Sequence, residues 1–263
     1  MNEGENQILA HEQALRAWFT RDADPVLAEI DGLDIGWGGV QRWATKFLAL
    51  PDNDLHLDFA CGYGTFLAQL GWRFPSIQLI GLNIDFCGPH AAIRPLLAQA
   101  GVTVILVQAD ACWMPFTGCS LDSVSCFMGL QDIEIGFKEV GVRSAVVEAV
   151  RVLIPGGLLV LIDEFPIERF DVILDGLPIH VIDQRERHLD VRWDWDVATA
   201  AIRLYAAGLV AQMRLPEDDE AAHSAAYREA LRRMEVEVVA QISGQGYYVP
   251  FGPLRMIVGR KVE

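Results

Sequence analysis

The sequence predicts an α/β fold built on a mostly parallel sheet, and three observations support this prediction. The apolar stretch Leu55–Phe59 runs directly into a turn with glycine at alternate positions, Gly62 and Gly64. Further short apolar stretches follow, and polar residues such as Asn83 and Asp110 stand at or just after their ends. A helical pattern over 145–153 separates two of these stretches. Strands that alternate with helices are typical of a doubly wound, Rossmann-like sheet.

The turn after the first strand has the composition of a ligand-binding loop. Gly62 and Gly64 lack a Cβ, so the backbone can adopt unusual dihedral angles and a ligand can lie against it. Ala60 fits the start of the turn without strain if its φ is negative. Asp58 stands at the end of the strand, where its carboxylate can accept hydrogen bonds from the N–H or O–H groups of a ligand.

The residues of the same turn distinguish between two kinds of nucleotide-binding site. A dinucleotide fingerprint needs a third glycine, and that position is Leu67 here. The carboxylate of Asp58 before the loop would repel a pyrophosphate but attract an ammonium group. The pattern therefore favours a ligand with an amino-acid moiety, and a dehydrogenase is the least favoured function.

The second and third strands are expected at 76–83 and 102–107. In folds of this kind a polar group at the end of the second strand binds ribose hydroxyls. Asn83 is the preferred candidate, with Asp85 as the N-cap of the next helix; the reverse assignment stays open. Asp110 follows the third strand, at the carboxyl edge where open α/β sheets bind their ligands.

The remaining strands complete a sheet of seven. They are expected at 120–128, 158–163, 178–182 and 254–259, and the turn Ile154-Pro155-Gly156-Gly157 precedes the fifth. His56, within the first strand, is expected to be a satisfied core or cleft histidine.

Four motifs in order over 55–164 resemble the class I S-adenosylmethionine (SAM) methyltransferases, in particular the small-molecule enzymes of ubiquinone and menaquinone biosynthesis. The motifs are the Asp58–Gly64 turn, Asp110-Ala111 followed by Pro115-Phe116, Asp122, and the Pro155-Gly156-Gly157 turn. The chain departs from the family at Ala60, where glycine is usual, and at Asn83, where an acid is usual. The resemblance implies methyl transfer from SAM to a small, partly apolar molecule, and an antiparallel seventh strand at the sheet edge.

The resemblance also implies a cofactor site and the surrounding domains. The residues expected to bind SAM are Asp58, Ala60, Gly62, Gly64, Asn83, Ile84, Asp110 and Ala111, with Asp110 and Ala111 at the adenine. Residues 1–50 are expected to form an N-terminal helical lid, with a loop over 34–39 and a helix over 40–50. Residues 51–194 form the α/β core, 195–234 a helical cap insertion, and 235–263 a C-terminal loop and the last strand.

Methyl transfer from a sulfonium needs orientation of donor and acceptor, and a base only where the acceptor is protonated. Asp132 is the first candidate for a base or substrate anchor. The family often has a histidine near this position and this chain does not, which argues against a histidine base. The further substrate candidates, at strand ends and in loops, are Trp37, Gln131, Glu164, Tyr247 and Tyr248.

Composition limits the partners. The net charge of −15, from 21 basic and 36 acidic residues, disfavours a nucleic-acid substrate. The apolar runs are too short for a membrane span and the N-terminus has no basic region, so we expect a soluble cytoplasmic protein. The five cysteines lack C-x-x-C pairing and the six histidines lack ligand-like spacing, so no metal is expected. The oligomeric state is not predicted.

Two alternatives to methyl transfer remain open at this stage. One is an enzyme of the same fold with a different outcome, such as decarboxylation, cyclisation or aminopropyl transfer. The other is a non-catalytic SAM-binding or scaffolding protein that uses its cap as an interaction surface. The feature that separates them is whether polar groups converge on the position of the methyl group.

Overall fold

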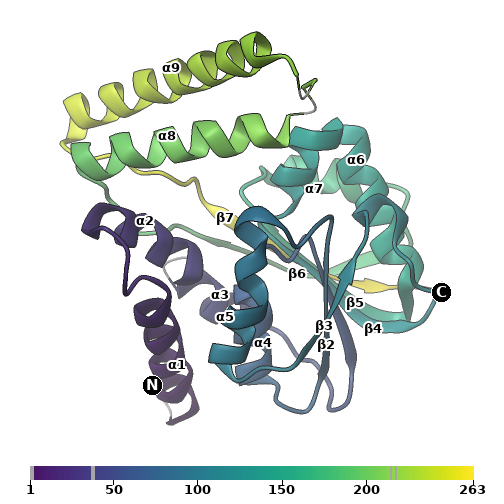
Figure 1. Ribbon diagram of the computed structural model, residues 1–263. Helices are drawn as coiled ribbons and strands as arrows, with labels where there is room; N and C mark the ends of the chain where they lie inside the picture. Colours follow the sequence, from purple (N-terminus) through teal and green to yellow (C-terminus); the bar gives the residue numbers. More distant parts are fainter. Residues whose placement is uncertain (1–2, 37–38, 214, 217) are drawn as a thin grey trace.

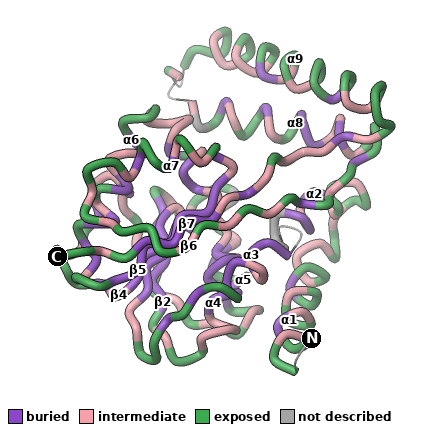
Figure 2. Tube along the Cα trace, turned by 180° about the vertical axis from the view of Figure 1, so that it is seen from behind, coloured by how far each residue is buried: buried purple, intermediate pink, exposed green. Residues whose placement is uncertain are grey.

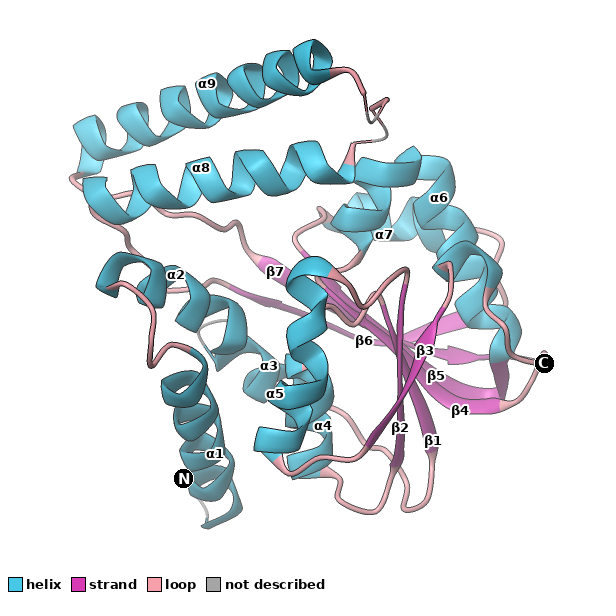
Figure 3. Ribbon diagram, in the orientation of Figure 1, coloured by secondary structure: helices cyan, strands magenta, loops and turns pink. Residues whose placement is uncertain are grey.

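The computed structural model describes residues 3–36, 39–213, 215–216 and 218–263. Within these residues, seven strands form one sheet in the order β3-β2-β1-β4-β5-β7-β6 (Figures 1 and 3). The strands are β1 Leu55–Phe59, β2 Gln78–Asn83, β3 Val104–Gln108, β4 Leu121–Phe127, β5 Leu153–Asp163, β6 Ile179–Arg187 and β7 Leu254–Lys261. The first five pair in parallel, and β7 is antiparallel to both β5 and β6. This is the expected class I methyltransferase fold.

Helices cover both faces of the sheet, and alternate strand residues face the two sides. Leu159 and Leu161 of β5 pack in one core cluster with α6 (Leu130–Val152) and α7 (Ile167–Leu174). Val160 and Ile162 pack in a second cluster with α4 (Thr65–Arg73) and α5 (Ile93–Ala100). Figure 2 shows the buried trace concentrated in the strands. Two-sided burial explains why residues 158–162 of β5 form a continuous apolar run.

The N-terminal helices are α1 (Glu3–Phe19), α2 (Pro25–Gly36) and α3 (Val40–Thr45). Ion pairs dock α1 on the core, since Glu5 pairs with Arg73 of α4 and with Lys46 at 2.8 Å. The loop expected over 34–39 is wrong at its start, because α2 continues through Gly36. The helix expected over 40–50 ends early, at Thr45.

Helices α8 (Trp195–Gln212) and α9 (Glu220–Gln245) form an antiparallel pair above the carboxyl edge of the sheet (Figure 1). This pair lies where the sequence predicts a helical cap insertion, but α9 continues past the predicted C-terminal boundary at residue 234. Residues 235–245, expected as a loop, continue α9 until Gly246, whose φ of 85° ends the helix. Hydrophobic residues of the cap surround the buried Trp193, which stacks on Tyr205.

Three further boundaries differ from the sequence prediction. The helix expected over 145–153 is the end of the longer α6, which is broken at Lys138, where φ is 63°. The Pro-Gly-Gly turn lies inside β5 as an irregularity, because Leu121 pairs with Leu153 while Ser123 pairs with Leu158. β6 continues to Arg187 with exposed and partly exposed residues, and it occupies the sheet edge that was expected for β7. The edge position of the seventh strand came from the resemblance alone, and the structure corrects it, because β7 lies between β5 and β6.

None of the helices in the described part of the chain combines the length and the hydropathy that crossing a membrane requires.

Candidate functional site

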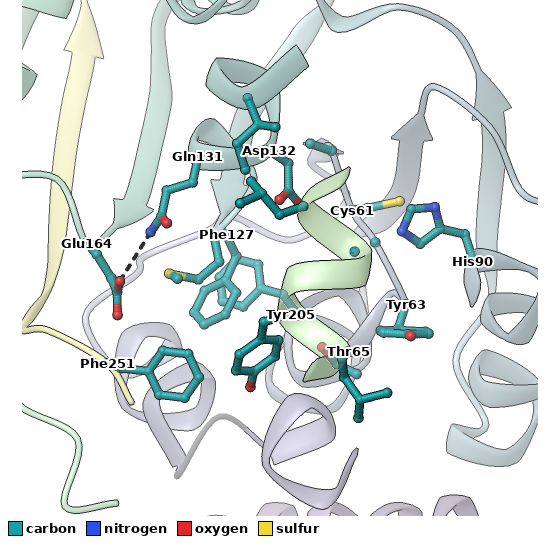
Figure 4. A pocket seen from close by; sticks show the side chains of 18 of the residues that line it. Cys61, Tyr63, Thr65, His90, Phe127, Gln131, Asp132, Glu164, Tyr205 and Phe251 are labelled. Carbon is teal, nitrogen blue, oxygen red and sulfur yellow. Dashed lines mark hydrogen bonds between the residues drawn. The ribbon is translucent and has the colours of Figure 1, made fainter. Parts of the chain in front are cut away.

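A cavity of about 530 Å³ lies between the carboxyl edge of the sheet and the helical cap (Figure 4). Its floor comes from the β1–α4 turn and the end of β4, and its roof from α8, α9 and the segment before β7. The lining residues are Asp58, Ala60, Cys61, Gly62, Tyr63, Thr65, Phe66, His90, Phe127, Met128, Gln131, Asp132, Ile135, Glu164, Leu204, Tyr205, Gly208, Leu209, Met234, Pro250 and Phe251. The volume is in the range of small-molecule sites.

The β1–α4 turn forms the sheet side of this cavity and has left-handed backbone at three positions. Gly62 and Gly64 have φ of 51° and 77°, which glycine adopts without strain. Ala60 has φ of 52°, so the condition under which it would fit the turn without strain, a negative φ, is not met. An L-residue in this conformation costs roughly 1–2 kcal/mol. Met128, just after the neighbouring strand β4, also has positive φ, at 55°, so two strained residues line the same side of the cavity.

Asp58 is the buried acid at the floor of the cavity. Its carboxyl group is 1% exposed, and Ser125 Oγ donates a hydrogen bond to Asp58 Oδ1 over 2.6 Å. Burial raises the pKa of Asp58 to about 7, and the Ser125 hydrogen bond opposes this rise. Among the described residues, no ion pair involves Asp58. A buried carboxyl group without a cation next to it is suited to a cationic ligand.

His56 extends this polar group away from the cavity. Its Nε2 lies 2.9 Å from Ser125 Oγ and its Nδ1 lies 2.8 Å from Ser123 Oγ. Complete burial lowers the pKa of His56 to about 3, so the ring is neutral. His56 is thus a satisfied core histidine, as expected from its place within the first strand.

The other expected cofactor residues lie along the same sheet edge, beyond the cavity lining. Asn83 is buried, and its Nδ2 donates to the Asp85 carbonyl over 3.0 Å, while Asp85 Oδ1 accepts from Cys87 N over 3.0 Å. Asp85 therefore makes a local turn bond, but the expectation that it is the N-cap of the next helix is wrong, because Cys87 holds the N-cap position of the 3₁₀ helix Gly88–Ala92. Asp110 Oδ1 accepts from Cys112 N over 2.8 Å at the start of a short 3₁₀ helix, Ala111–Trp113. The structure leaves Ile84 half exposed.

Polar groups also meet on the far side of the cavity, where α6 begins and β5 ends (Figure 4). Gln131 Nε2 donates to Glu164 Oε2 over 3.4 Å. Glu164 Oε1 is buried and has no hydrogen-bond partner of normal geometry among the described residues. Burial raises the pKa of Glu164, and Gln131 and the Gly252 backbone partly offset this rise. Asp132 lines the same region.

Asp163 fixes the backbone that carries these polar groups. It is fully buried; its Oδ2 accepts from Leu130 N over 3.1 Å and its Oδ1 from Glu164 N over 2.8 Å. These bonds join the N-terminus of α6 to the end of β5. Burial raises the pKa of Asp163 to about 7. Its position follows from the sequence as the last residue of a buried strand.

Apolar and aromatic side chains make up the rest of the wall around Gln131 and Glu164. Phe127 stacks on Phe66, with ring centroids 5.0 Å apart, and Tyr205 and Phe251 face the cavity from the cap side (Figure 4). Leu209 and Met234 come from the cap helices. The sequence predicted a helical cap insertion over 195–234, but it contained no signal that a single helical residue such as Met234 would line the cavity.

Two of the expected substrate residues lie outside the cavity lining. Tyr248 is buried in the cap beside Trp193, and burial raises its pKa to about 12. Tyr247 lies under Arg192, whose guanidinium carbon is 4.8 Å from the ring centroid. Trp37 lies outside the described residues. In the described ranges, no three His, Cys, Asp or Glu side chains are grouped so that they could hold a metal ion.

The part of the chain that contains the glycine turn is also the part that resembles known proteins. Residues 57–161 match a family described as a methyltransferase domain. A demethylmenaquinone methyltransferase from Thermus thermophilus is 36% identical over 136 residues, which are 50% of this chain and 58% of that protein. The protein of that name from Deinococcus radiodurans is 30% identical over 141 residues, 51% of this chain and 52% of its own length. The chain thus spans about half the length of the curated relatives it matches.

Among solved structures, the [4+2]-cyclase SpnF has a TM-score of 0.57 to this chain, with 16% identity over 86% of this chain and 81% of that one. That likeness shows the fold alone. The match over 57–161 contains the end of β1, the glycine turn, β2 with Asn83, Asp110 just after β3, and β4 with Ser125. Over residues 57–161 the chain is thus similar to methyltransferase domains, and its curated relatives over about half of its length are methyltransferases.

Proposed function

We propose that this protein transfers a methyl group from SAM to a small, partly apolar molecule with a ring, of the quinol class. One observation carries the proposal: a single cavity joins the Asp58 turn to an aromatic wall that contains Gln131, Asp132 and Glu164. The turn forms the end of the cavity that would bind the cofactor, the cofactor end. The aromatic wall, with few polar groups, forms the end that would bind the methyl acceptor, the acceptor end. Sites for small molecules commonly have this composition.

The cofactor end fits SAM in its chemistry. Asp58 is buried and faces the cavity with a carboxyl group that a cationic ammonium would neutralise. Gly62 has only open space where a Cβ would stand, judged against the described residues, so a ligand can approach the backbone. The residues proposed to hold SAM are Asp58, Ala60, Gly62, Gly64, Asn83, Ile84, Asp110 and Ala111. When bound, SAM supplies an activated methyl group on a sulfonium.

The acceptor end orients the substrate and excludes water. The rings of Phe127, Tyr205 and Phe251 would sandwich a flat ring, and burial of apolar area would provide the binding free energy. Glu164 Oε1 would accept a hydrogen bond from a hydroxyl of the acceptor, and Gln131 would hold the Glu164 carboxyl group in place. Asp132 stays the first candidate for the base that takes the acceptor proton.

The names of the relatives suggest the acceptor class. Both are demethylmenaquinone methyltransferases, which supports a ring of quinone type here. The acidic net charge of −15 supports a small molecule over a nucleic acid as substrate. Cytoplasmic location stays a prediction of the sequence.

The test has two stages. Calorimetric titration of the full chain with SAM, S-adenosylhomocysteine and NAD in parallel should show binding of the first two and none of NAD. Incubation with SAM and a reduced 1,4-naphthoquinone that carries a prenyl chain and an unsubstituted neighbouring carbon should then yield the methylated ring by mass spectrometry. The oxidised quinone and an Asp58→Asn variant are the controls. Absence of SAM binding would overturn the proposal at the cofactor.

The same experiment separates the alternative outcomes. Consumption of the acceptor without transfer of the methyl group would favour a non-methyl reaction, which the likeness to a cyclase in fold makes worth measuring. Binding of SAM with no conversion of any ring acceptor would favour the scaffolding alternative.

A further inference from the structure

The polar group behind the cofactor turn is built by the register of two parallel strands. His56 pairs with Ser123, and Asp58 pairs with Ser125, across β1 and β4. Residues two apart on a strand face the same side, so the four side chains lie in one row. All four are at most 1% exposed. The row runs from Ser123 through His56 and Ser125 to Asp58, with distances of 2.8, 2.9 and 2.6 Å.

The direction of every hydrogen bond in this row follows from one bond. The Ser125 hydroxyl has one proton and donates it to Asp58 Oδ1. Ser125 Oγ must then accept from His56, so Nε2 carries the proton of the neutral ring. Nδ1 has a lone pair in this tautomer and accepts from the Ser123 hydroxyl. Each hydroxyl and each ring nitrogen of the row is thereby satisfied.

We propose that Ser125 and His56 are positioning residues for the cofactor: they fix the Asp58 carboxyl group by one oxygen and leave the other for the ammonium of SAM. This inference rests on the proposed function. His56 directs the lone proton of Ser125 toward Asp58, because its Nε2–H occupies the acceptor side of the hydroxyl. Without that constraint the hydroxyl can rotate and Asp58 loses its fixed orientation.

No other titratable group near Asp58, among the described residues, is placed to orient its carboxyl group, so Ser125 and His56 must do so. Asp58 acts electrostatically on the thiols of Cys61 and Cys126, and burial, the largest cause, raises the pKa of both well above the ordinary value. They remain neutral and supply no strong donor. His56 is neutral as well, so its effect on Asp58 passes through the Ser125 hydroxyl.

The test is the dissociation constant of S-adenosylhomocysteine, which retains the ammonium, measured by calorimetry on the full chain. We expect Ser125→Ala to weaken binding about tenfold, as for the loss of one charge-assisted hydrogen bond. Ser123→Ala is the matched control, because it removes the same group from the same buried strand at the other ring nitrogen. It should change binding by less than about twofold while it lowers the melting temperature similarly.

Two further measurements separate positioning from a structural role. Ser125→Thr keeps the hydroxyl and should restore binding. The ¹⁵N shifts of His56 in the complex should report a neutral ring with the proton on Nε2; a proton on Nδ1, or a charged ring, would overturn the inference. If Ser125→Ala does not fold, Ser125→Cys and Ser123→Cys replace the pair, since a thiol is a weaker donor.

The outcomes are distinguishable. Equal weakening by Ser125→Ala and Ser123→Ala, or no weakening by either, would overturn the positioning role while wild-type binding leaves the proposed function intact. Absence of binding to the wild type would overturn the proposed function itself.

Discussion

Gln131 at the start of α6 donates a hydrogen bond to Glu164 at the end of β5, and the other carboxyl oxygen of Glu164 is buried in the same region. An acceptor oxygen without a partner of normal geometry, inside a largely apolar wall, costs free energy unless a ligand donates to it. Asp163 holds both backbones in place from below. This arrangement is the reason to look for the acceptor contact at Glu164.

Glu164→Gln should lower kcat/KM for the ring acceptor about tenfold to a hundredfold, since the amide keeps the shape but accepts a hydroxyl bond more weakly. The dissociation constant of S-adenosylhomocysteine should stay unchanged. Steady-state kinetics and calorimetry check the two halves. The exposed Glu168, on α7, gives the matched control Glu168→Gln, and an equal loss of activity there would contradict the assignment.

Cofactor binding should release a proton from Asp58. Burial raises the pKa of Asp58 to about 7, so below that pH the carboxyl group is largely neutral and attracts the ammonium weakly. Affinity for S-adenosylhomocysteine should therefore rise as pH increases toward about 7 and then level off. Calorimetry at about pH 6 in buffers of different ionisation enthalpy should show up to about one proton released. Asp58→Asn should abolish both effects; a pH-independent wild type would refute the linkage.

The free protein should show the matching trend in stability. Asp58 and Asp163 both have pKa raised to about 7 by burial, against an ordinary value of 3.8. The folded state keeps protons that the unfolded state releases near pH 4, so this stabilisation is complete below that pH and is lost as pH rises toward 7. Urea unfolding across this range should give a falling free energy of unfolding. Asp163→Asn should reduce the slope, and a slope unaffected by this change would assign it to other groups.

The sequence predicted the fold and the sheet side of the cavity because both depend on local patterns. Apolar strands, the Gly62–Gly64 turn and acids at strand ends are visible without tertiary structure. The φ of Ala60 was not visible, because its sign depends on how the turn packs against Gly129. The residues of the aromatic wall were harder still to predict from the sequence. Met234 lines the cavity and Tyr248 does not because of how α8 and α9 dock, and helical periodicity does not specify docking.

Gly129→Ala should destabilise the protein by roughly 1–3 kcal/mol, as overpacking does. A Cβ at Gly129 would lie 2.5 Å from Ala60 Cβ and 2.9 Å from Cys126 Sγ. Ala60→Gly removes the first clash and relieves the positive φ of Ala60, so the double variant should recover part of the loss. Urea unfolding of the two single variants and the double variant gives the coupling. Additive changes in the free energy of unfolding would mean that the two residues are not in steric conflict.

Met234→Ala should raise KM for the ring acceptor about tenfold or less and leave cofactor affinity unchanged. Met234 lines the cavity from α9, and its truncation removes apolar area that a bound ring would bury, at about 25 cal/mol per Å². Val236 stands two residues along the same helix and is 61% exposed, so Val236→Ala is the control for any general effect on α9. Kinetics with acceptors of increasing prenyl length sharpen the test. A loss that grows with chain length would place the prenyl chain under the cap, whereas a KM equal for both variants would remove α9 from the acceptor site.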